Sequence, residues 1–236
     1  WHAHDLPLVQ IIGRDGRLAG EAAGPYAGLT LTAARARIVD DLAAHGHLTG
    51  RTAAEQAVRV HERCDTPAEY RVTAQWFIRV LELRDALLAG GERLAWHPAH
   101  MAARYREWGE SVGWDWCISR QRRFGVPFPL WTCRACGEVV PADRAALPVD
   151  PRTDPAPGPC RCGSTDLAPE PDVMDTWATS SLSPQIAGRL LDDPALFRRV
   201  FPFALRPQAH EIIRTWTYYT LVQSRYHFGC EPWSRV

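Results

Sequence analysis

The sequence predicts an α/β fold, in which helices alternate with the strands of a parallel sheet. Short apolar runs, such as residues 6–12 and the tryptophan-rich run around residue 116, alternate with segments of helical periodicity. Strands and helices that alternate in this way are typical of a parallel sheet covered by helices. With 236 residues, of which 46% are hydrophobic, the chain can bury one sizeable core or two small ones.

Composition excludes several classes of protein. No apolar run approaches the roughly 20 residues that cross a bilayer, and residues 1–8 carry neither a basic flank nor an apolar targeting segment. We therefore expect a cytoplasmic protein without a membrane partner. The 27 basic and 27 acidic residues balance, so any nucleic-acid contact must be a local patch. Every basic residue is Arg, which excludes a lysine phosphate loop and a Schiff-base lysine. Because the chain lacks a starting Met, we expect a segment of a longer protein.

The first 50 residues are expected to form a strand, a turn and a helix. Residues 6–12 form the apolar run, residues 13–17 (GRDGR) are a turn signal, and residues 28–48 have helical periodicity. Thr30 or Thr32 is the expected N-cap. The face predicted to pack on a core consists of Ala33, Ala36, Val39, Leu42 and Ala43.

The middle of the chain predicts a hairpin followed by two helices. Residues 61–80 alternate as a strand hairpin does, and residues 81–91 read as a short helix that ends in Gly. His61 and Cys64 are spaced as metal ligands can be, but no partner pair lies nearby. The next helix leads into a buried strand, and its core face is formed by Met101, Tyr105, Trp108 and Val112.

The last third predicts a strand end, two short helical segments and one long helix. Residues 172–179 lie at the strand end, and Ser183 with Pro184 marks the start of a helix. Residues 192–202 form a short helix. Residues 205–229 begin as a turn and continue as a long helix, whose expected core stripe is Ile212, Trp216, Tyr219 and Val222.

Four of the seven cysteines have the spacing of a zinc knuckle. Cys133 and Cys136 form a C-x2-C pair, Cys160 and Cys162 form a C-x-C pair, and a Pro-rich loop separates the pairs. A Gly follows the second sulfur of each pair, where a tight turn lets backbone N–H groups face the thiolates. We predict a structural zinc site, since four protein ligands leave no position for water. The alternative is a set of reduced, buried cysteines; a disulfide framework is not expected.

Three motifs occur in a fixed order: WDWCISRQRRFGVPFPLW within residues 113–131, DVMDTWATSSL at 172–182 and LRPQAHEIIRTW at 205–216. Together they resemble the valyl-tRNA synthetases, class I aminoacyl-tRNA ligases, in their archaeal-type form. The resemblance implies part of a Rossmann-like class I catalytic domain with a zinc knuckle and the C-terminal part of an inserted editing domain. The implied divisions are 1–72 (editing domain), 73–131 (catalytic), 132–170 (zinc knuckle) and 171–236 (catalytic).

The resemblance also implies an activity for the intact protein, which we expect to be a monomer. Such an enzyme activates valine with ATP and Mg²⁺, transfers it to the 3′ end of tRNA(Val) and edits mischarged threonine. The ATP signature motifs of the family are not found in this chain. Because the chain contains no lysine, the Lys-Met-Ser-Lys-Ser loop cannot be present in it. We therefore expect no catalytic residue here, and a chain that by itself neither activates valine nor edits.

Substrate-binding residues follow from the same resemblance. Trp177 and Ile212 match the wall of the valine pocket, and we expect them to close on the ligand from opposite sides. Glu211 matches an acidic position beside the adenylate and His210 the polar residue before it, although Ala209 stands where many relatives have Gly. Asp175 could orient the loop, reach the ammonium or simply cap a helix.

Arg120, Arg122, Arg123 and Arg214 are candidates either for contacts to the acceptor end of tRNA or for salt bridges inside the fold.

Two other functions stay open. One is an isoleucyl- or leucyl-tRNA synthetase segment, and the other is a non-enzymatic zinc-knuckle module that binds nucleic acid or protein.

Overall fold

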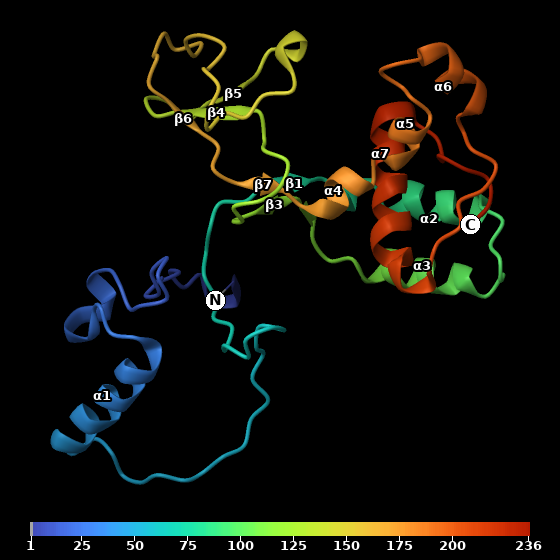
Figure 1. Cartoon of the computed structure of the whole chain (residues 1–236). Helices are drawn as coiled ribbons and strands as arrows, with labels where there is room; N and C mark the ends of the chain where they lie inside the picture. Colours follow the sequence, from blue (N-terminus) through green and yellow to red (C-terminus); the bar gives the residue numbers. More distant parts are fainter. Residues whose placement is uncertain (1) are drawn as a thin grey trace. The chain divides into compact units, whose positions relative to one another are not determined.

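The computed structural model describes residues 2–236, and the chain divides into two compact units (Figure 1). The first unit ends at Ala74 and the second comprises Gln75–Val236. Helices and short strands are mixed in the second unit, whereas the first is helical and irregular. In the described part of the chain, no helix combines the length and the apolarity that crossing a membrane requires.

The first unit contains the helix α1 (Leu31–Ala44) and the 3-10 segments η1 (His2–His4) and η2 (Glu21–Tyr26). Thr30 is the N-cap of α1, because its hydroxyl accepts the N–H of Ala33 at 3.3 Å, as predicted. The turn at 13–17 is also confirmed by the hydrogen bond from Gly13 N–H to the carbonyl of Arg17. The strand predicted at 6–12 is wrong, since only its last residue forms a bridge, to Leu18.

The predicted core face of α1 is also wrong. Ala34 is the buried residue of the helix and packs with Leu18 and Ala23, while Leu31 packs against this small core. Val39 is half-buried and the other members of the predicted face are exposed: Ala33, Ala36, Leu42 and Ala43. Apolar residues surround much of this helix, so periodicity alone could not select which side meets the short core of this unit.

Residues 61–80 do not form the predicted hairpin. A single bridge between Val60 and Pro67 closes a turn, and the first strand is β1 (Phe77–Ile78) in the second unit. Alternating side chains make a strand possible, but a ladder also needs a partner strand at the right distance. In the structure β1 pairs instead with β2 (Trp116–Cys117), some 40 residues later.

Three helices form the core of the second unit: α2 (Arg84–Arg93), α3 (Met101–Ser111) and α7 (Tyr218–Phe228). The 3-10 turn η3 (Leu81–Leu83) precedes α2, which runs two residues beyond the predicted end at Gly91. Tyr105, from the predicted face of α3, is buried and donates its hydroxyl to the carbonyl of Leu87 at 2.8 Å. Gly91 lets α2 approach this ring, since a Cβ there would lie 2.2 Å from it.

All named strands pair in antiparallel fashion, so the predicted parallel sheet is not found among them. Besides β1–β2, the strand β3 (Ser119–Arg120) pairs with β7 (Val173–Met174). A three-stranded sheet has the order β5 (Val139–Pro141), β4 (Leu130–Cys133), β6 (Leu167–Pro169). Within residues 2–236, parallel pairing is limited to two isolated bridges, from Ala95 to Arg235 and from Phe203 to Trp233. The C-terminal segment thus lies between two parallel neighbours, but too few bonds form for a ladder.

The remaining helices are short: η4 (Arg144–Ala146), α4 (Thr176–Ser180), α5 (Ser183–Ala187) and α6 (Pro194–Val200). The 3-10 turn η5 (His210–Ile212) and the π-helical turn η6 (Ile213–Thr217) precede α7. Ile213 and Thr217 are buried, whereas the predicted Ile212 and Trp216 are half-buried. A π turn holds an extra residue, so it shifts the inward face relative to an even helical stripe.

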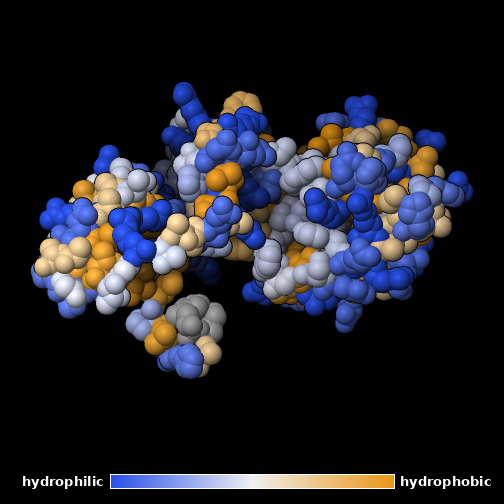
Figure 2. Space-filling view, turned by 90° about the horizontal axis from the view of Figure 1, so that it is seen from below, coloured by the Kyte–Doolittle hydropathy of each residue, from blue (hydrophilic) through white to orange (hydrophobic). Residues whose placement is uncertain are grey.

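Apolar side chains are not confined to the core. Tyr70, Phe124 and Leu191 are the most exposed large ones in the described residues. On the face drawn in Figure 2, the hydrophobic residues form several small patches between hydrophilic ones. Small interrupted patches of this kind are ordinary for protein surfaces and do not by themselves mark a site.

Candidate functional site

The first candidate site begins where β7 ends. Asp175 is the N-cap of α4, and its Oδ1 accepts the N–H of Trp177 at 3.0 Å. An Asp directly after a strand therefore starts the helix and fixes the backbone of Trp177. The capping role, one of the three expected for Asp175, is what the structure shows.

Arg120 holds the other oxygen of the same carboxylate. Its guanidinium donates to Asp175 Oδ2 at 2.5 Å and to the carbonyls of Cys117 and Ser119. The Asp175 side chain is 10% exposed and that of Arg120 35%. Of the two roles expected for Arg120, the structure therefore displays the internal salt bridge. Arg122 and Arg123 are exposed in the loop that follows β3.

A cavity of about 250 Å³ opens beside this ion pair, and we call it the aromatic cavity. Asp175 and Arg120 both line it, and Trp116 and Tyr219 stack in its wall with ring centroids 3.8 Å apart. Burial and the nearby Asp175 raise the pKa of Tyr219. The other lining residues are Val80, Trp108, Ser111, Val112, Trp114, Asp115, Cys117, Trp177 and Thr215. Such a lining suits a small apolar group that carries a charge at one end.

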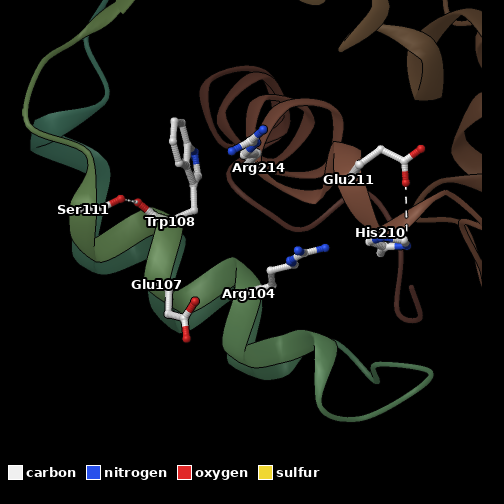
Figure 3. Close-up of a pocket in the computed structure, with 7 residues that line it drawn as sticks. All are labelled: Arg104, Glu107, Trp108, Ser111, His210, Glu211 and Arg214. Carbon is white, nitrogen blue, oxygen red and sulfur yellow. Dashed lines mark hydrogen bonds and ion pairs between the residues drawn. The ribbon is translucent and has the colours of Figure 1, made fainter. Parts of the chain in front are cut away.

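A second cavity, of about 340 Å³, lies between α3 and the η5–η6 segment, and we call it the charged cavity (Figure 3). His210 Nδ1 lies 3.7 Å from Glu211 Oε2 on one side. The remaining lining residues are Arg104, Glu107, Trp108, Ser111 and Arg214. Trp108 and Ser111 line both cavities, so the two are direct neighbours.

The predicted substrate-binding residues are divided between these cavities. Trp177 and Asp175 line the aromatic cavity, and His210 and Glu211 line the charged one. Ile212 is half-buried and lines neither, so it does not share a cavity with Trp177 as expected. Thr215 and Tyr219 lie on the Trp177 cavity instead, because the η5–η6 turns interrupt the regular helix.

Sequence reasoning missed the part that α3 contributes. Trp108 was expected only to pack in the core, and Arg104 and Glu107 were not singled out. Position 108 packs against the core through an edge-on contact with Tyr218 and also separates the two cavities. The available signal was the charged positions 104 and 107, which flank the apolar face of the helix.

The four predicted metal ligands do come together. The sulfur atoms of Cys133, Cys136, Cys160 and Cys162 all lie within 4.8 Å of one another, and the Cys133–Cys162 and Cys136–Cys160 distances are both 3.6 Å. Four thiolates at about 2.3 Å from one zinc ion are separated by about 3.8 Å, so the donor set fits a tetrahedral metal. The cluster could therefore hold a metal ion.

Two turns and a sheet explain how the cluster forms. Cys133 is the last residue of β4, and the central position of β4 in its sheet fixes it. Gly137 and Gly163, which follow the second cysteine of each pair, have φ values of 77° and 87°. Only Gly adopts this left-handed conformation easily, so these residues allow the tight turns that the sequence suggested.

The backbone also favours a thiolate at the first cysteine. Burial by itself would raise the pKa of Cys133, but the N–H groups of Cys136 and Ala135 outweigh it and lower the pKa to about 6. Metal ions bind the thiolate and not the thiol. The same cluster raises the pKa of Cys136 and of Cys160, so without a metal the thiolate is favoured at Cys133 and disfavoured at those two positions.

Comparisons with known proteins place this geometry in a family. Residues 39–236 match the sequence model of the tRNA synthetases class I (I, L, M and V). A valine–tRNA ligase of Thermoplasma acidophilum is 46% identical over 237 residues, which is 100% of this chain and 30% of the relative. The valine–tRNA ligase of Methanopyrus kandleri is 46% identical over 236 residues, with 99% of this chain and 25% of the relative covered. The chain thus spans between 25% and 30% of the length of these relatives.

Among solved structures, one neighbour is the LeuRS of Agrobacterium radiobacter K84, determined as a ternary complex with tRNA and LeuAMS. It is 23% identical, with a TM-score of 0.40, and the match covers 52% of this chain and 19% of that one. A likeness this low carries no argument. The sequence match at 39–236 extends over most of the chain, and on that ground the chain belongs to the class I tRNA synthetases of the I, L, M and V group.

Proposed function

We propose that this chain is a segment of a valine–tRNA ligase, which joins valine to ATP as valyl-adenylate and then transfers it to tRNA(Val). The observation that carries the proposal is the aromatic cavity, whose size and largely apolar, aromatic lining, with the Asp175–Arg120 pair in its wall, suit a small branched amino acid. Relatives that carry the name valine–tRNA ligase match nearly the whole chain, which supports the same substrate.

In this proposal the aromatic cavity holds the isopropyl group of valine. Trp177 provides a rigid apolar wall, and burial of the side chain against it excludes water. Asp175 lines the same cavity, and its carboxylate, shared with Arg120, can attract the ammonium. ATP enters as a substrate, accompanied by Mg²⁺.

The charged cavity is the proposed neighbourhood of the nucleotide, with His210 and Glu211 at its edge. Attack of the valine carboxylate on the α-phosphate releases pyrophosphate. A reaction of this kind depends mainly on positioning and on stabilisation of charge around the phosphate. The residues of this chain are proposed to bind and orient, and the ATP signature motifs of the family are not part of it.

The substrate is tested in the full-length protein that contains this chain by valine-dependent ATP–pyrophosphate exchange, with isoleucine and leucine as competitors. We expect exchange with valine, and a KM for valine raised about tenfold or more in Trp177→Ala, since an apolar wall of roughly 2 kcal/mol is lost. Thr176→Ala, at the exposed neighbouring position, is the control and should behave as the wild type. Exchange that prefers isoleucine or leucine would identify another synthetase, and no exchange at all would favour a binding module.

We also propose that the four-cysteine cluster holds one structural zinc ion. All four positions are taken by protein, which leaves none for a reacting water. Cys160→Ser should lower the zinc content below one ion per chain, whereas Cys64→Ser, an exposed cysteine of the first unit, should leave it unchanged. An unaltered one-to-one ratio in Cys160→Ser would contradict the site.

The first unit is proposed to be part of an editing domain.

Arg122 and Arg123 are proposed to contact the acceptor end of tRNA. Both arginines are exposed, so their guanidinium groups can reach phosphates. Arg122→Ala with Arg123→Ala should raise the KM for tRNA(Val) and leave the valine-dependent exchange unchanged. A change in exchange alone would contradict a role in tRNA binding.

A further inference from the structure

We infer that Arg104 and Arg214 form a clamp for a nucleotide phosphate in the charged cavity. The inference rests on the proposed function, because it assigns two further binding residues to the reaction of that protein. Neither a role in substrate binding for Arg104 nor a pairing of the two arginines is suggested by the sequence alone.

The two guanidinium groups reach one cavity from different elements. Arg104 extends from α3 towards the turn that carries His210, and Arg214 belongs to η6 on the facing side (Figure 3). Both side chains belong to exposed residues, so each can be reached by a ligand. The clamp is therefore formed only when the tertiary fold brings α3 against η6.

Neither arginine takes part in an ion pair among the residues that the structure describes. Two positions further along α3, by contrast, Arg106 pairs with Glu92 at 3.6 Å. In the cavity itself Glu211 is associated with His210 at 3.7 Å. The guanidinium groups of Arg104 and Arg214 thus keep their donors available for an external anion.

The chemistry of the cavity selects a phosphate. A guanidinium presents N–H donors in a planar fork that matches phosphate oxygens, and two forks can hold one group from both sides. A space of about 340 Å³ lined mainly by charged groups does not suit an apolar ligand. Glu107 and Glu211 also line the cavity and oppose a further negative charge, so they should weaken the binding that the arginines provide.

The position next to the aromatic cavity indicates which phosphate is bound. Trp108 and Ser111 are shared between the cavities, so a phosphate held by the clamp adjoins a group held beside Trp177. In an aminoacyl-adenylate the phosphate is bonded to the carboxyl of the amino acid. The terminal nucleotide of tRNA brings a ribose hydroxyl to the same carboxyl, and the phosphate of that nucleotide is attached to the same ribose. The shared chemistry is a phosphate of an adenosine nucleotide, supplied either by ATP or by the tRNA end.

The experiment uses the full-length protein and four variants: Arg104→Ala, Arg214→Ala, the double variant and, as the matched control, Arg106→Ala. Binding of ATP and of tRNA is titrated by calorimetry without valine, and KM and kcat are measured for exchange and for tRNA charging. We expect the double variant to weaken binding of one of the two ligands by about 10- to 100-fold, as for the loss of charge-assisted hydrogen bonds. The KM for valine should change less than about threefold, and Arg106→Ala should match the wild type.

Two further variants keep the result interpretable. The double variant Arg104→Lys with Arg214→Lys retains the charge without the fork and should restore part of the binding. Glu107→Gln should tighten binding of the same ligand that the double variant weakens. Loss confined to ATP identifies the ATP phosphate, and loss confined to tRNA identifies the acceptor end.

Equal binding of both ligands by the wild type, the double variant and Arg106→Ala would overturn the clamp. Equal losses in Arg106→Ala and in the double variant would also overturn it, since the effect would then come from general surface charge. A wild-type protein that exchanges no pyrophosphate with valine would refute the proposed function instead. The calorimetric titration would still report on the clamp in that case.

Discussion

Asp175 joins two interactions that one pair of substitutions can separate. Its Oδ1 caps α4 and its Oδ2 accepts Arg120. Asn caps a helix about as well as Asp, so Asp175→Asn removes the charge pair and retains the cap, whereas Asp175→Ala removes both. The comparison of the two variants therefore measures each contribution in the same place.

The expected magnitudes follow from burial. Loss of an N-cap costs about 1 kcal/mol. The Arg120 side chain is 35% exposed, so solvent screens the ion pair and its loss should also cost about 1 kcal/mol, well below the cost of breaking a fully buried pair. Asp175→Asn should therefore reduce the free energy of unfolding by about 1 kcal/mol, and Asp175→Ala by about 2 kcal/mol.

Urea unfolding of the 236-residue chain, followed by circular dichroism, gives these free energies. Asp166→Asn is the control, because its pair with Arg134 is 3.4 Å long and more than 60% exposed on both sides, and it should change little. Equal losses in the Asn and Ala variants of Asp175 would show that the cap contributes nothing. Wild-type stability in both would refute the reasoning altogether.

Three other predictions concern the core. Gly91→Ala should destabilise the chain by about 1–3 kcal/mol in urea unfolding, since the added Cβ would overlap the ring of Tyr105. Gly113→Ala is the control and should not destabilise it, because a Cβ at that position would have no neighbouring atom within 4 Å. Tyr105→Phe should cost about 1 kcal/mol in the same assay, because a buried carbonyl loses its donor. Burial pushes the pKa of Glu231 up, but the hydrogen bond from Arg93 and a second guanidinium outweigh it and hold the pKa below its ordinary value. The stabilisation by Glu231 is therefore present above pH about 4.3 and lost on acidification below it, so thermal melts should show a weaker acid dependence in Glu231→Gln.

Several local features could be predicted because neighbouring residues determine them. Thr30 caps a helix through its own hydroxyl, and the inward face with Tyr105 follows from a spacing of three and four residues. The four cysteines converge because the Gly after each pair permits a tight turn. The order of three motifs also indicated the family before any coordinates were considered.

Other features depend on residues far apart in the sequence. The partner strand of β1 lies at Trp116–Cys117. The local sequence of residues 61–80 does not indicate this distant partner, so a local hairpin was predicted. The predicted parallel pairing of the strands was likewise wrong, since the named strands pair antiparallel. An alternation of strands and helices along the chain does not specify which strands become neighbours. On α1 the apolar residues surround the helix, so only the small core of that unit selects the buried side.

The sequence by itself determined the family, the N-cap of α1 and the convergence of four cysteines, since short-range geometry and residue chemistry suffice for these. The tertiary structure alone decided that Arg120 pairs with Asp175, 55 positions later in the sequence. It also decided that Trp177 lines the aromatic cavity without Ile212, and that Arg104 lines the charged cavity together with His210. The physical reason for the ion pair is the pairing of β3 with β7. For the two cavities it is the π-helical turn at Ile213–Thr217 and the packing of α3 against it. Both place side chains by contacts that no local periodicity contains.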